Sequence, residues 1–261
     1  MKTFREIYQY RELLKTNIKK DIRGRYKGSV LGVLWTFLNP LLQVFVYYIV
    51  FPYLMRGAAI PNYLVYLITG LIPWTFFLTT VSQGTTAIKA NAGILKKVYF
   101  PREILLFSQV CSGWVNFMIS CIIILIFCLI FGVGISVQLI VVPLISLIEG
   151  MLILGIIYIL SAINVYVQDI EYIVQFILNM LFYGTPVLYS LSQFSGANRI
   201  LYSLIAYNPI TILIDAYRDC FLYHVWPNWL ALATVACLSV VVILVGRVIF
   251  HKLERGFAEE L

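Results

Sequence analysis

The stretch ILLFSQVCSGWVNFMISCIIILIFCLIFGVGISVQLIVVPLISLI, residues Ile104 to Ile148, contains no Asp, Glu, Lys or Arg. A helix needs roughly 20 apolar residues to cross the hydrocarbon core of a lipid bilayer. The stretch is therefore long enough for about two crossings. We expect two membrane-spanning helices here, near residues 104–131 and 138–164.

Charge-free runs also cover most of the remaining chain, namely Gly28 to Met55, Gly57 to Ile88, Tyr172 to Asn198 and Cys220 to Gly246. Of the 261 residues 61% are hydrophobic and 12% are charged, whereas a soluble domain carries roughly 25% charged residues. This composition predicts an all-α polytopic membrane protein. We place its six transmembrane helices near residues 30–55, 63–88, 104–131, 138–164, 172–191 and 227–249.

The N-terminal segment has a different pattern, because charged and apolar residues alternate through residues 1–28. Apolar residues from Phe4 to Ile22 recur at helical spacing, with Lys and Arg on the other faces. This predicts an amphipathic helix that lies in the membrane interface, either as a basic anchor that fixes orientation or as a binding element. The segment lacks the apolar core of a cleavable signal peptide. The domain layout is thus 1–28 interface helix, 29–250 transmembrane domain and 251–261 cytoplasmic tail.

The positions of the basic residues predict the orientation of the six spans. If the N-terminus is cytoplasmic, 16 of the 19 Lys and Arg residues lie on the cytoplasmic side, and the other three are Arg56, Arg199 and Arg218. Positive residues concentrate in cytoplasmic loops, so we expect both termini to be cytoplasmic. The basic residues flank the spans, which indicates contact with anionic lipid headgroups and not with nucleic acid.

Residues 198–224 do not fit a seventh crossing, because they contain Arg199, Asp215, Arg218 and Asp219 and are interrupted at Asn208-Pro209. A seventh crossing would also place the basic C-terminus outside. We interpret this segment as a pair of re-entrant helices between spans five and six, covered by protein or a watery cavity. The three charges near residue 218 could form a local ion pair or act in gating.

Uncharged polar residues follow single helix faces within two of the predicted spans. Span one carries Thr36, Asn39, Gln43 and Tyr47, and span five carries Gln175, Asn179 and Tyr183. Amides do not face lipid without a large cost in free energy, so both faces point toward another helix or toward water. Two interpretations stand: hydrogen bonds between helices, or the lining of a pore.

Span three carries a similar ridge of small and polar residues, which favours close helix packing over contact with a substrate: Ser108, Ser112, Asn116 and Ser120. Glu149 lies alone in span four and is either a proton site or gate, or a structural hydrogen-bonded group.

The predicted cytoplasmic segment Lys89 to Glu103 is unusually apolar for a connection in water. It places large apolar residues, such as Ile94 and Phe100, beside basic residues, such as Lys96 and Arg102. A short helix that docks on another protein explains this pattern, and contact with the lipid interface is the alternative.

Several enzyme classes lack their signature residues in this sequence. There is no GxxxxGK[ST] phosphate loop. The two histidines, His224 and His251, have no Cys or carboxylate at metal-ligand spacing, and we expect His251 to be solvated in the basic tail. No Ser, His and acid residues fall at a shared membrane depth. We therefore expect a transport subunit that is not an enzyme and that itself binds no metal or cofactor.

Three motifs occur in order along the chain: RGRYKGSVLGVLWTFLNPLLQ (Arg23 to Gln43), ILKKVYFPREIL (Ile94 to Leu105) and NPITILIDAYRD (Asn208 to Asp219). They resemble the permease subunits of type-2 ABC exporters, in the branch that moves O-antigen, capsule or teichoic acid. The resemblance implies two copies of this chain, two copies of a separate cytoplasmic ATPase that binds ATP and Mg, and a lipid-linked glycan as substrate. It also implies the bacterial inner membrane.

The resemblance further implies roles for three sets of residues. Spans one and five line the substrate path in the family, which implies that role for Asn39, Gln43, Tyr47, Gln175, Asn179 and Tyr183. The ATPase-coupling region corresponds to Lys96, Lys97, Val98, Tyr99, Phe100, Pro101, Arg102 and Glu103. The outer gate corresponds to Asn208, Pro209, Asp215 and Arg218. Alternative functions are a type-2 ABC exporter of a drug or other small hydrophobic molecule, an integral glycolipid-modifying enzyme, and a membrane scaffold.

Overall fold

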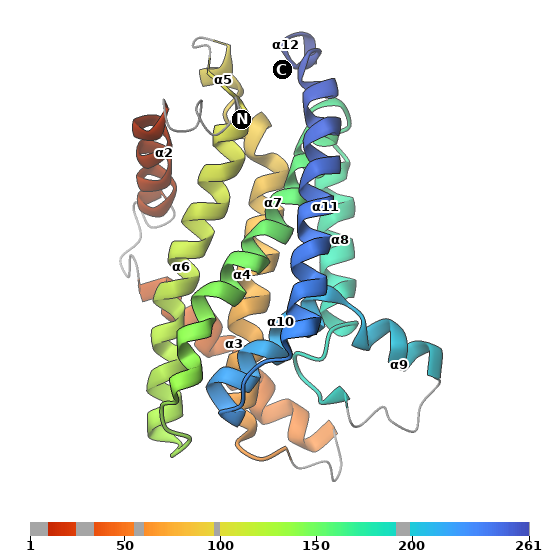
Figure 1. Cartoon of the computed structure of the whole chain (residues 1–261). Helices are drawn as coiled ribbons and strands as arrows, with labels where there is room; N and C mark the ends of the chain where they lie inside the picture. The colour runs from red at the N-terminus through yellow and green to blue at the C-terminus, as the bar shows by residue number, and fades with distance from the viewer. Residues whose placement is uncertain (1–9, 25–33, 55–59, 97–99, 192–198, 261) are drawn as a thin grey trace.

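The computed structural model describes residues 10–24, 34–54, 60–96, 100–191 and 199–260, and every regular element within these ranges is a helix (Figure 1). The first half contains α2 (Arg11–Gly24), α3 (Leu34–Leu54), α4 (Tyr63–Ala90), α5 (Ala92–Leu95) and α6 (Glu103–Ile130). The second half contains η1 (Val137–Val141), α7 (Val142–Tyr166), α8 (Ile170–Tyr183), α9 (Arg199–Ala206), α10 (Pro209–Arg218), η3 (Asp219–Tyr223), α11 (Trp229–Glu254) and α12 (Phe257–Glu260).

Four long helices form the central bundle and are apolar enough to cross a membrane: α4, α6, α11 and the continuous η1–α7 segment. They correspond to the spans predicted near 63–88, 104–131, 227–249 and 138–164, and their observed ends differ from the predicted ends by a few residues. Charge-free length was thus a sufficient signal for these four elements.

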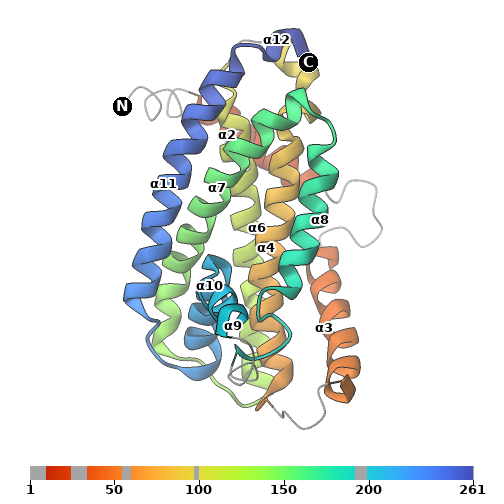
Figure 2. The ribbon, with the colours of Figure 1, turned by 90° about the vertical axis from the view of Figure 1, so that its right-hand side faces the viewer.

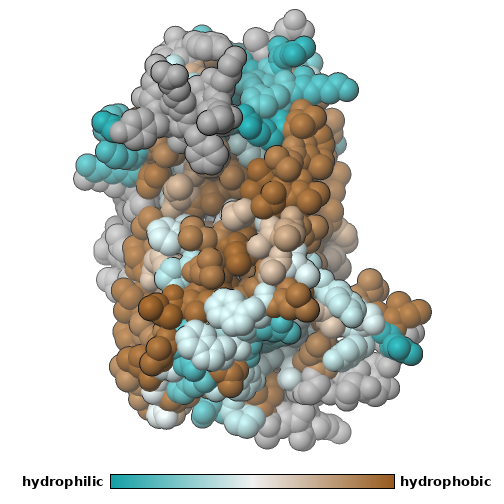
Figure 3. All heavy atoms as spheres, in the orientation of Figure 1, coloured by the Kyte–Doolittle hydropathy of each residue, from teal (hydrophilic) through white to brown (hydrophobic). Residues whose placement is uncertain are grey.

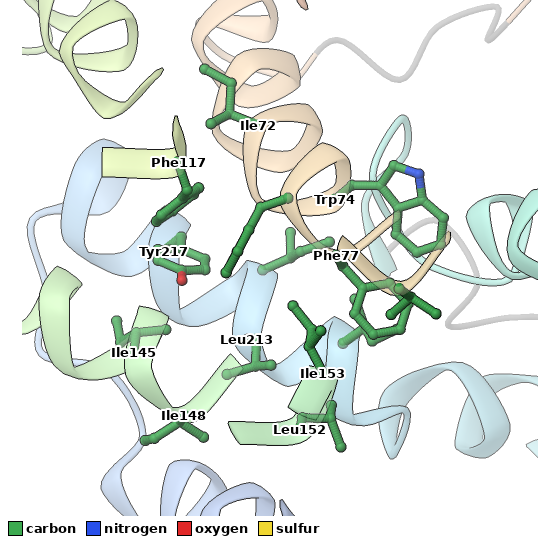
Figure 4. Close-up of a cluster of buried hydrophobic side chains, with 14 of the residues drawn as sticks. Ile72, Trp74, Phe77, Phe117, Ile145, Ile148, Leu152, Ile153, Leu213 and Tyr217 are labelled. Carbon is green, nitrogen blue, oxygen red and sulfur yellow. The ribbon is translucent and has the colours of Figure 1, made fainter. Parts of the chain in front are cut away.

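Large apolar side chains fill the centre of this bundle. Figure 4 shows Trp74 and Phe77 of α4, Phe117 of α6, Ile153 of α7 and Leu213 of α10 within one cluster, and all of them are buried. Glycines allow α7 and α11 to approach closely, since a Cβ atom at Gly246 would lie 2.6 Å from the backbone oxygen of Gly155. Such backbone contact is a common way for apolar helices to pack.

Helices α3 and α8 are attached at the side of α4 and contribute little to the core (Figure 2). The apolar part of α3, Leu38–Phe51, and the whole of α8 are shorter than the four spanning helices. The buried residues of α8 are Val174 and Leu178, one turn apart, so the helix contacts the bundle along a narrow face.

The predicted fifth span, 172–191, is wrong at its C-terminal end, because helix α8 ends at Tyr183. Gly184 is the C-cap residue and Pro186 follows. Proline has no backbone N–H and its ring collides with the carbonyl four residues earlier, which favours a helix end here, although α4 contains Pro73 without ending. Residues 184–191 form a loop built mainly of turns and bends instead, and Thr185 to Leu188 are buried.

Polar and apolar side chains are segregated on the surface. Figure 3 shows hydrophobic residues over the middle of one face and hydrophilic residues at the end where α12 lies. Helix α9 projects from the opposite half of the bundle (Figure 1), with Ile200 and Leu204 exposed on it and Tyr207 exposed just after it. We call the two ends the α12 end and the α10 end.

Candidate functional site

Three side chains donate hydrogen bonds to backbone carbonyls of the buried loop 184–191 at the α10 end. Arg218 of α10 donates from Nη1 to the carbonyl of Pro186 (2.7 Å) and from Nη2 to the carbonyl of Val187 (2.9 Å). Tyr63 and Tyr66 of α4 donate to the carbonyls of Leu188 (2.9 Å) and Tyr189 (2.7 Å). Buried backbone groups outside a helix need such partners, so these side chains make the loop possible.

Arg218 is held in place by further contacts. Its guanidinium carbon lies 3.6 Å from the ring centroid of Tyr66, a cation–π contact. Its Nη1 also lies 3.4 Å from an oxygen of Asp215. The local ion pair considered from the sequence is therefore present, and the shorter hydrogen bonds of Arg218 go to the loop backbone.

The other end of α10 reaches the same loop. Asn208 caps the helix by accepting a hydrogen bond from the backbone N–H of Ile210 (3.0 Å), and Pro209 occupies the first helical position. The Asn208 amide nitrogen also donates to the hydroxyl of Thr185 (3.2 Å). Asn208 at the start of α10 and Arg218 at its end thus both contact the loop 184–191. They are two of the four predicted gate residues.

Glu149 of α7 is buried and accepts a hydrogen bond from the hydroxyl of Tyr217 on α10 (2.8 Å). The contact joins α10 to the centre of the bundle, and Figure 4 shows Tyr217 next to Phe117. A hydrogen-bonded glutamate is one of the two interpretations open from the sequence.

The predicted substrate-path residues lie mostly on the surface of the single chain. Asn39 and Gln43 of α3 are exposed, as are Gln175, Asn179 and Tyr183 of α8. Within the described part of the chain, none of the four amide side chains has a hydrogen bond to another helix. Bonding between helices of one chain therefore does not explain these amides.

Tyr47, the sixth of these residues, is half-buried and links α3 to α8. Its ring stacks on Phe182 of α8 with centroids 6.0 Å apart, and Phe182 contacts Trp74 of α4 at 5.5 Å. The two polar faces thus flank one aromatic junction, on the side of the molecule where α3 and α8 both border α4 (Figure 2).

A cavity of about 360 Å³ lies between α3, α4 and α6. Its wall includes Asn39 of α3, Thr75 and Thr79 of α4, and Asn116 and Ser120 of α6. Asn39 therefore faces a space within one chain, and the ridge that the sequence assigned mainly to helix packing contributes two residues to that space.

Charged residues gather at the α12 end. Glu103, buried at the start of α6, lies 3.1 Å from Nε of Arg247 and 2.7 Å from Nε2 of His251. His251 also lies 3.2 Å from Glu254, whose carboxylate is 3.9 Å from Arg102 and whose backbone oxygen accepts a hydrogen bond from Arg102. We call these five residues the α12-end ion cluster.

This cluster changes the interpretation of the predicted coupling segment. Phe100 is buried, Arg102 contacts Phe257 of α12 and Glu103 pairs with Arg247 of α11. Lys96, just after α5, is exposed. Pro101 is half-buried, and Lys97, Val98 and Tyr99 lie outside the described residues. His251 is exposed, as expected, but it also contacts the carboxylates of Glu103 and Glu254. Its contact with Glu103 could not be predicted from a local pattern, because Glu103 is distant in the chain.

Helix α2 packs near the same end. Lys20 donates to the side chain of Asn91 (3.2 Å), and Gln109 of α6 donates to Asp21 (3.0 Å). On its exposed face, a hydrogen bond from Lys15 holds the pKa of Glu12 below its ordinary value. The polar contacts tie α2 to α6 and to the α4–α5 junction.

The described residues contain no group of three or more His, Cys, Asp or Glu side chains that could hold a metal ion. The described surfaces and cavity offer amides, hydroxyls and aromatic rings. Such groups bind neutral or polar ligands without covalent chemistry.

The family model described as ABC-2 type transporter matches residues 12–222. The chain belongs to the ABC-2 type transporter family. This ABC-2 transporter is 37% identical over 259 residues to the O-antigen export system permease protein RfbA of Myxococcus xanthus, with 98% of each chain covered. It is 34% identical to a Klebsiella pneumoniae protein of the same name, over 96% of this chain and 95% of that protein.

The ABC-2 transporter also shares a shorter region with the polysialic acid transport protein KpsM of Escherichia coli, at 33% identity over 29% of this chain. Its family membership and its long apolar helices together show a multi-pass membrane protein that serves as a transport component. The assignments of the path, coupling and gate residues stay predictions.

Proposed function

We propose that this ABC-2 transporter is the membrane permease subunit of an ATP-driven exporter that moves a lipid-linked polysaccharide of the O-antigen, capsule or teichoic acid type. The observation that carries this proposal is the near full-length similarity to permeases named for O-antigen export. The similarity covers α3, α8 and α10 together, so it includes every element of the proposed path.

Two copies of the chain form the transmembrane unit in this proposal, and two copies of a separate cytoplasmic ATPase bind ATP and Mg. The exposed amides of α3 and α8 support it, because amides avoid lipid and these have no hydrogen bond to another helix in the described part of the chain. A second copy placed against this side would enclose them. Sugar rings could then exchange hydrogen bonds among Gln43, Asn179 and their neighbours as the polymer moves.

Six helices cross the bacterial inner membrane in this arrangement: α3, α4, α6, α7, α8 and α11. Residues 29–250 form the transmembrane domain, with the 1–28 segment at the cytoplasmic interface and 251–261 in the cytoplasm. The excess of basic residues on one side supports cytoplasmic termini. The α12 end is then cytoplasmic, and α9 and α10 are the re-entrant pair at the outer side.

The ATPase acts at the α12 end. Lys96 and the neighbouring residues 97–99 contact the ATPase, while Arg102 and Glu103 pass its movement to α11 through the α12-end ion cluster. At the other end, α10 and loop 184–191 act as the gate. Asn208 and Arg218 hold the loop, Asp215 pairs with Arg218, and Pro209 begins α10.

A chromosomal deletion tests the function. Cells without this chain should accumulate the lipid-linked glycan inside and lose it from the surface, and the full-length chain should restore export. Loss of a small-molecule efflux activity with normal surface glycan would overturn the glycan assignment. Purification of the tagged chain should also yield an ATPase subunit.

The path assignment has its own test. Gln43→Leu combined with Asn179→Leu should reduce surface glycan severalfold at an unchanged level of assembled complex, because the amides would no longer bind sugar hydroxyls. Gln168→Leu, which changes an exposed amide outside both polar faces, is the matched control. Normal export by the double variant would contradict the assignment.

A further inference from the structure

The cavity between α3, α4 and α6 has features of a ligand site that helix packing does not require. Its volume of about 360 Å³ lies within the range of small-molecule pockets, roughly 300–1,000 Å³. It lies near the middle of α4 and α6, far from both ends of the bundle. Close packing normally leaves few voids larger than a water molecule.

Asn116 is the residue that most needs an explanation. It is more than nine-tenths buried at the wall of the cavity, and its amide nitrogen has no hydrogen-bond partner in the described structure. An unpaired amide in an apolar surrounding costs free energy. Since a terminal amide carries both donors and an acceptor, a ligand in the cavity could satisfy it.

The rest of the wall defines the chemistry of such a ligand. Asn39 and the hydroxyls of Thr75, Thr79 and Ser120 can bond polar groups, and Trp35 offers an aromatic ring. Thr79 and Ser120 donate their hydrogens to backbone carbonyls within their helices, so their oxygens are left to accept. None of the described residues that line the cavity is charged, which disfavours a phosphate or carboxylate.

We propose that this cavity binds one neutral sugar ring of a lipid-linked glycan. A sugar ring carries several hydroxyls that both donate and accept, and its apolar edges pack against aromatic rings. A lipid tail would leave the amides and hydroxyls unpaired. The cavity opens at α3, where Trp35 and Asn39 are exposed, so a ring enters from the side of the proposed path. This inference rests on the proposed function for the source of the sugar.

Photolabelling of native membranes that contain the full-length chain tests the site. The probe is an alkyl glucoside with a diazirine on the carbon next to the sugar. Two comparison probes carry the same chain and diazirine but end in a phosphate or a methyl group. We expect the glucoside to label peptides of α3, α4 and α6 that border the cavity, and soluble maltose to compete. Equal labelling by the methyl-ended probe, or no labelling there, would overturn the proposal.

A pair of asparagine variants separates binding from folding. Asn116→Leu should reduce the labelling about threefold to tenfold, the effect of one hydrogen bond. It should not lower the melting temperature, because the lost amide nitrogen had no partner. Asn164→Leu is the matched control, since the Asn164 amide donates to the carbonyl of Thr85 (3.2 Å), so this variant should lower the melting temperature and leave the labelling unchanged.

Glycan export identifies the source of the ring. Reduced export by Asn116→Leu assigns the site to the transported glycan, and normal export with lost labelling assigns it to a resident neutral glycolipid. Both results support a sugar site. Failure of the deletion strain to lose surface glycan would remove the proposed function while leaving the labelling result intact. Labelling that Asn116→Leu does not change would overturn the sugar site.

Discussion

The α10 end and the α12 end of the bundle are held by opposite kinds of polar contact. At the α10 end, Arg218 is 1% exposed and donates to two uncharged carbonyls of the loop 184–191. At the α12 end, Glu103 is also buried, but its partners Arg247 and His251 have side chains that are 38% and 49% exposed. One end surrounds a cation with protein, and the other shares its charges with water.

This difference has a mechanical consequence. Arg218 cannot leave its partners without exposing a bare charge to an apolar interior, which carries a large desolvation cost. Arg247 or His251 can each turn to water while the other still pairs with the buried Glu103, so this exchange costs less than the release of Arg218. We expect the α10 end to move as one body with α4, and the α12 end to rearrange when a partner protein pulls on it.

Replacement of Arg218 should have the largest effect. Arg218→Met leaves the carbonyls of Pro186 and Val187 without donors, at about 1–3 kcal/mol for each buried group. A combined loss of about 3 kcal/mol corresponds to a fall in melting temperature of about 6–12 °C for a chain of this size. Thermal melting of the detergent-purified chain measures it.

The matched control for Arg218 is Arg199→Met, which removes an exposed arginine from α9 and should leave the melting temperature nearly unchanged. Arg218→Lys should fall between the two, because a lysine ammonium cannot reproduce the planar fork that reaches both carbonyls. If Arg218→Met and the wild type had equal melting temperatures, the buried contacts of the α10 end would not be stronger than the exposed ones of the α12 end.

Replacement of Glu103 should have a moderate effect on stability and a larger one on transport. Glu103→Gln keeps the size of the side chain, and both basic partners can turn to water, so we expect a loss of about 1 kcal/mol. If the α12-end ion cluster transmits movement, the variant should hydrolyse ATP in complex but export less glycan for each ATP. Glu260→Gln, an exposed change in α12, is the control. An unchanged ratio of export to hydrolysis would contradict the coupling role.

The sequence predicted the elements of this comparison but not its contacts. Charge-free length located α4, α6, α7 and α11, and the Asn208-Pro209 break matches the boundary between α9 and α10. The end of α8 was missed, although Gly184 and Pro186 marked it, because the apolar run continued past them. Hydropathy records how apolar a segment is and says nothing about where its backbone hydrogen bonds go.

The site residues were predicted less completely, for the same physical reason. Glu103 and Arg247 are separated by 144 positions, and Arg218 and Pro186 by 32, so no local pattern connects them. The cavity at Asn116 depends on three helices that meet only in the fold. Periodicity did identify the exposed amides of α3 and α8, because a helix face is a local property.

Variants of the tyrosines beside Arg218 should show how much each hydrogen bond to the loop contributes to stability at the α10 end. Tyr66→Phe removes the hydrogen bond to Tyr189 but keeps the ring under Arg218, so we expect a loss of about 1 kcal/mol, well below that of Arg218→Met. Tyr63→Phe, at a half-buried position, should cost less still. The melting temperatures of both variants, measured in parallel, rank the two stability losses. A Tyr66→Phe effect as large as that of Arg218→Met would place the main contact on the hydroxyl.

Replacement of His251 should have the smallest effect and the most diagnostic salt dependence. His251→Gln removes a contact shared with water, so it should cost at most about 1 kcal/mol at low salt. At 1 M salt the screening length is about 3 Å, and the difference from the wild type should nearly vanish. The effect of Arg218→Met should persist under the same conditions, because buried contacts are screened much less. Melting curves at both salt concentrations compare the two ends directly, and equal salt dependence of the two variants would show that water reaches both.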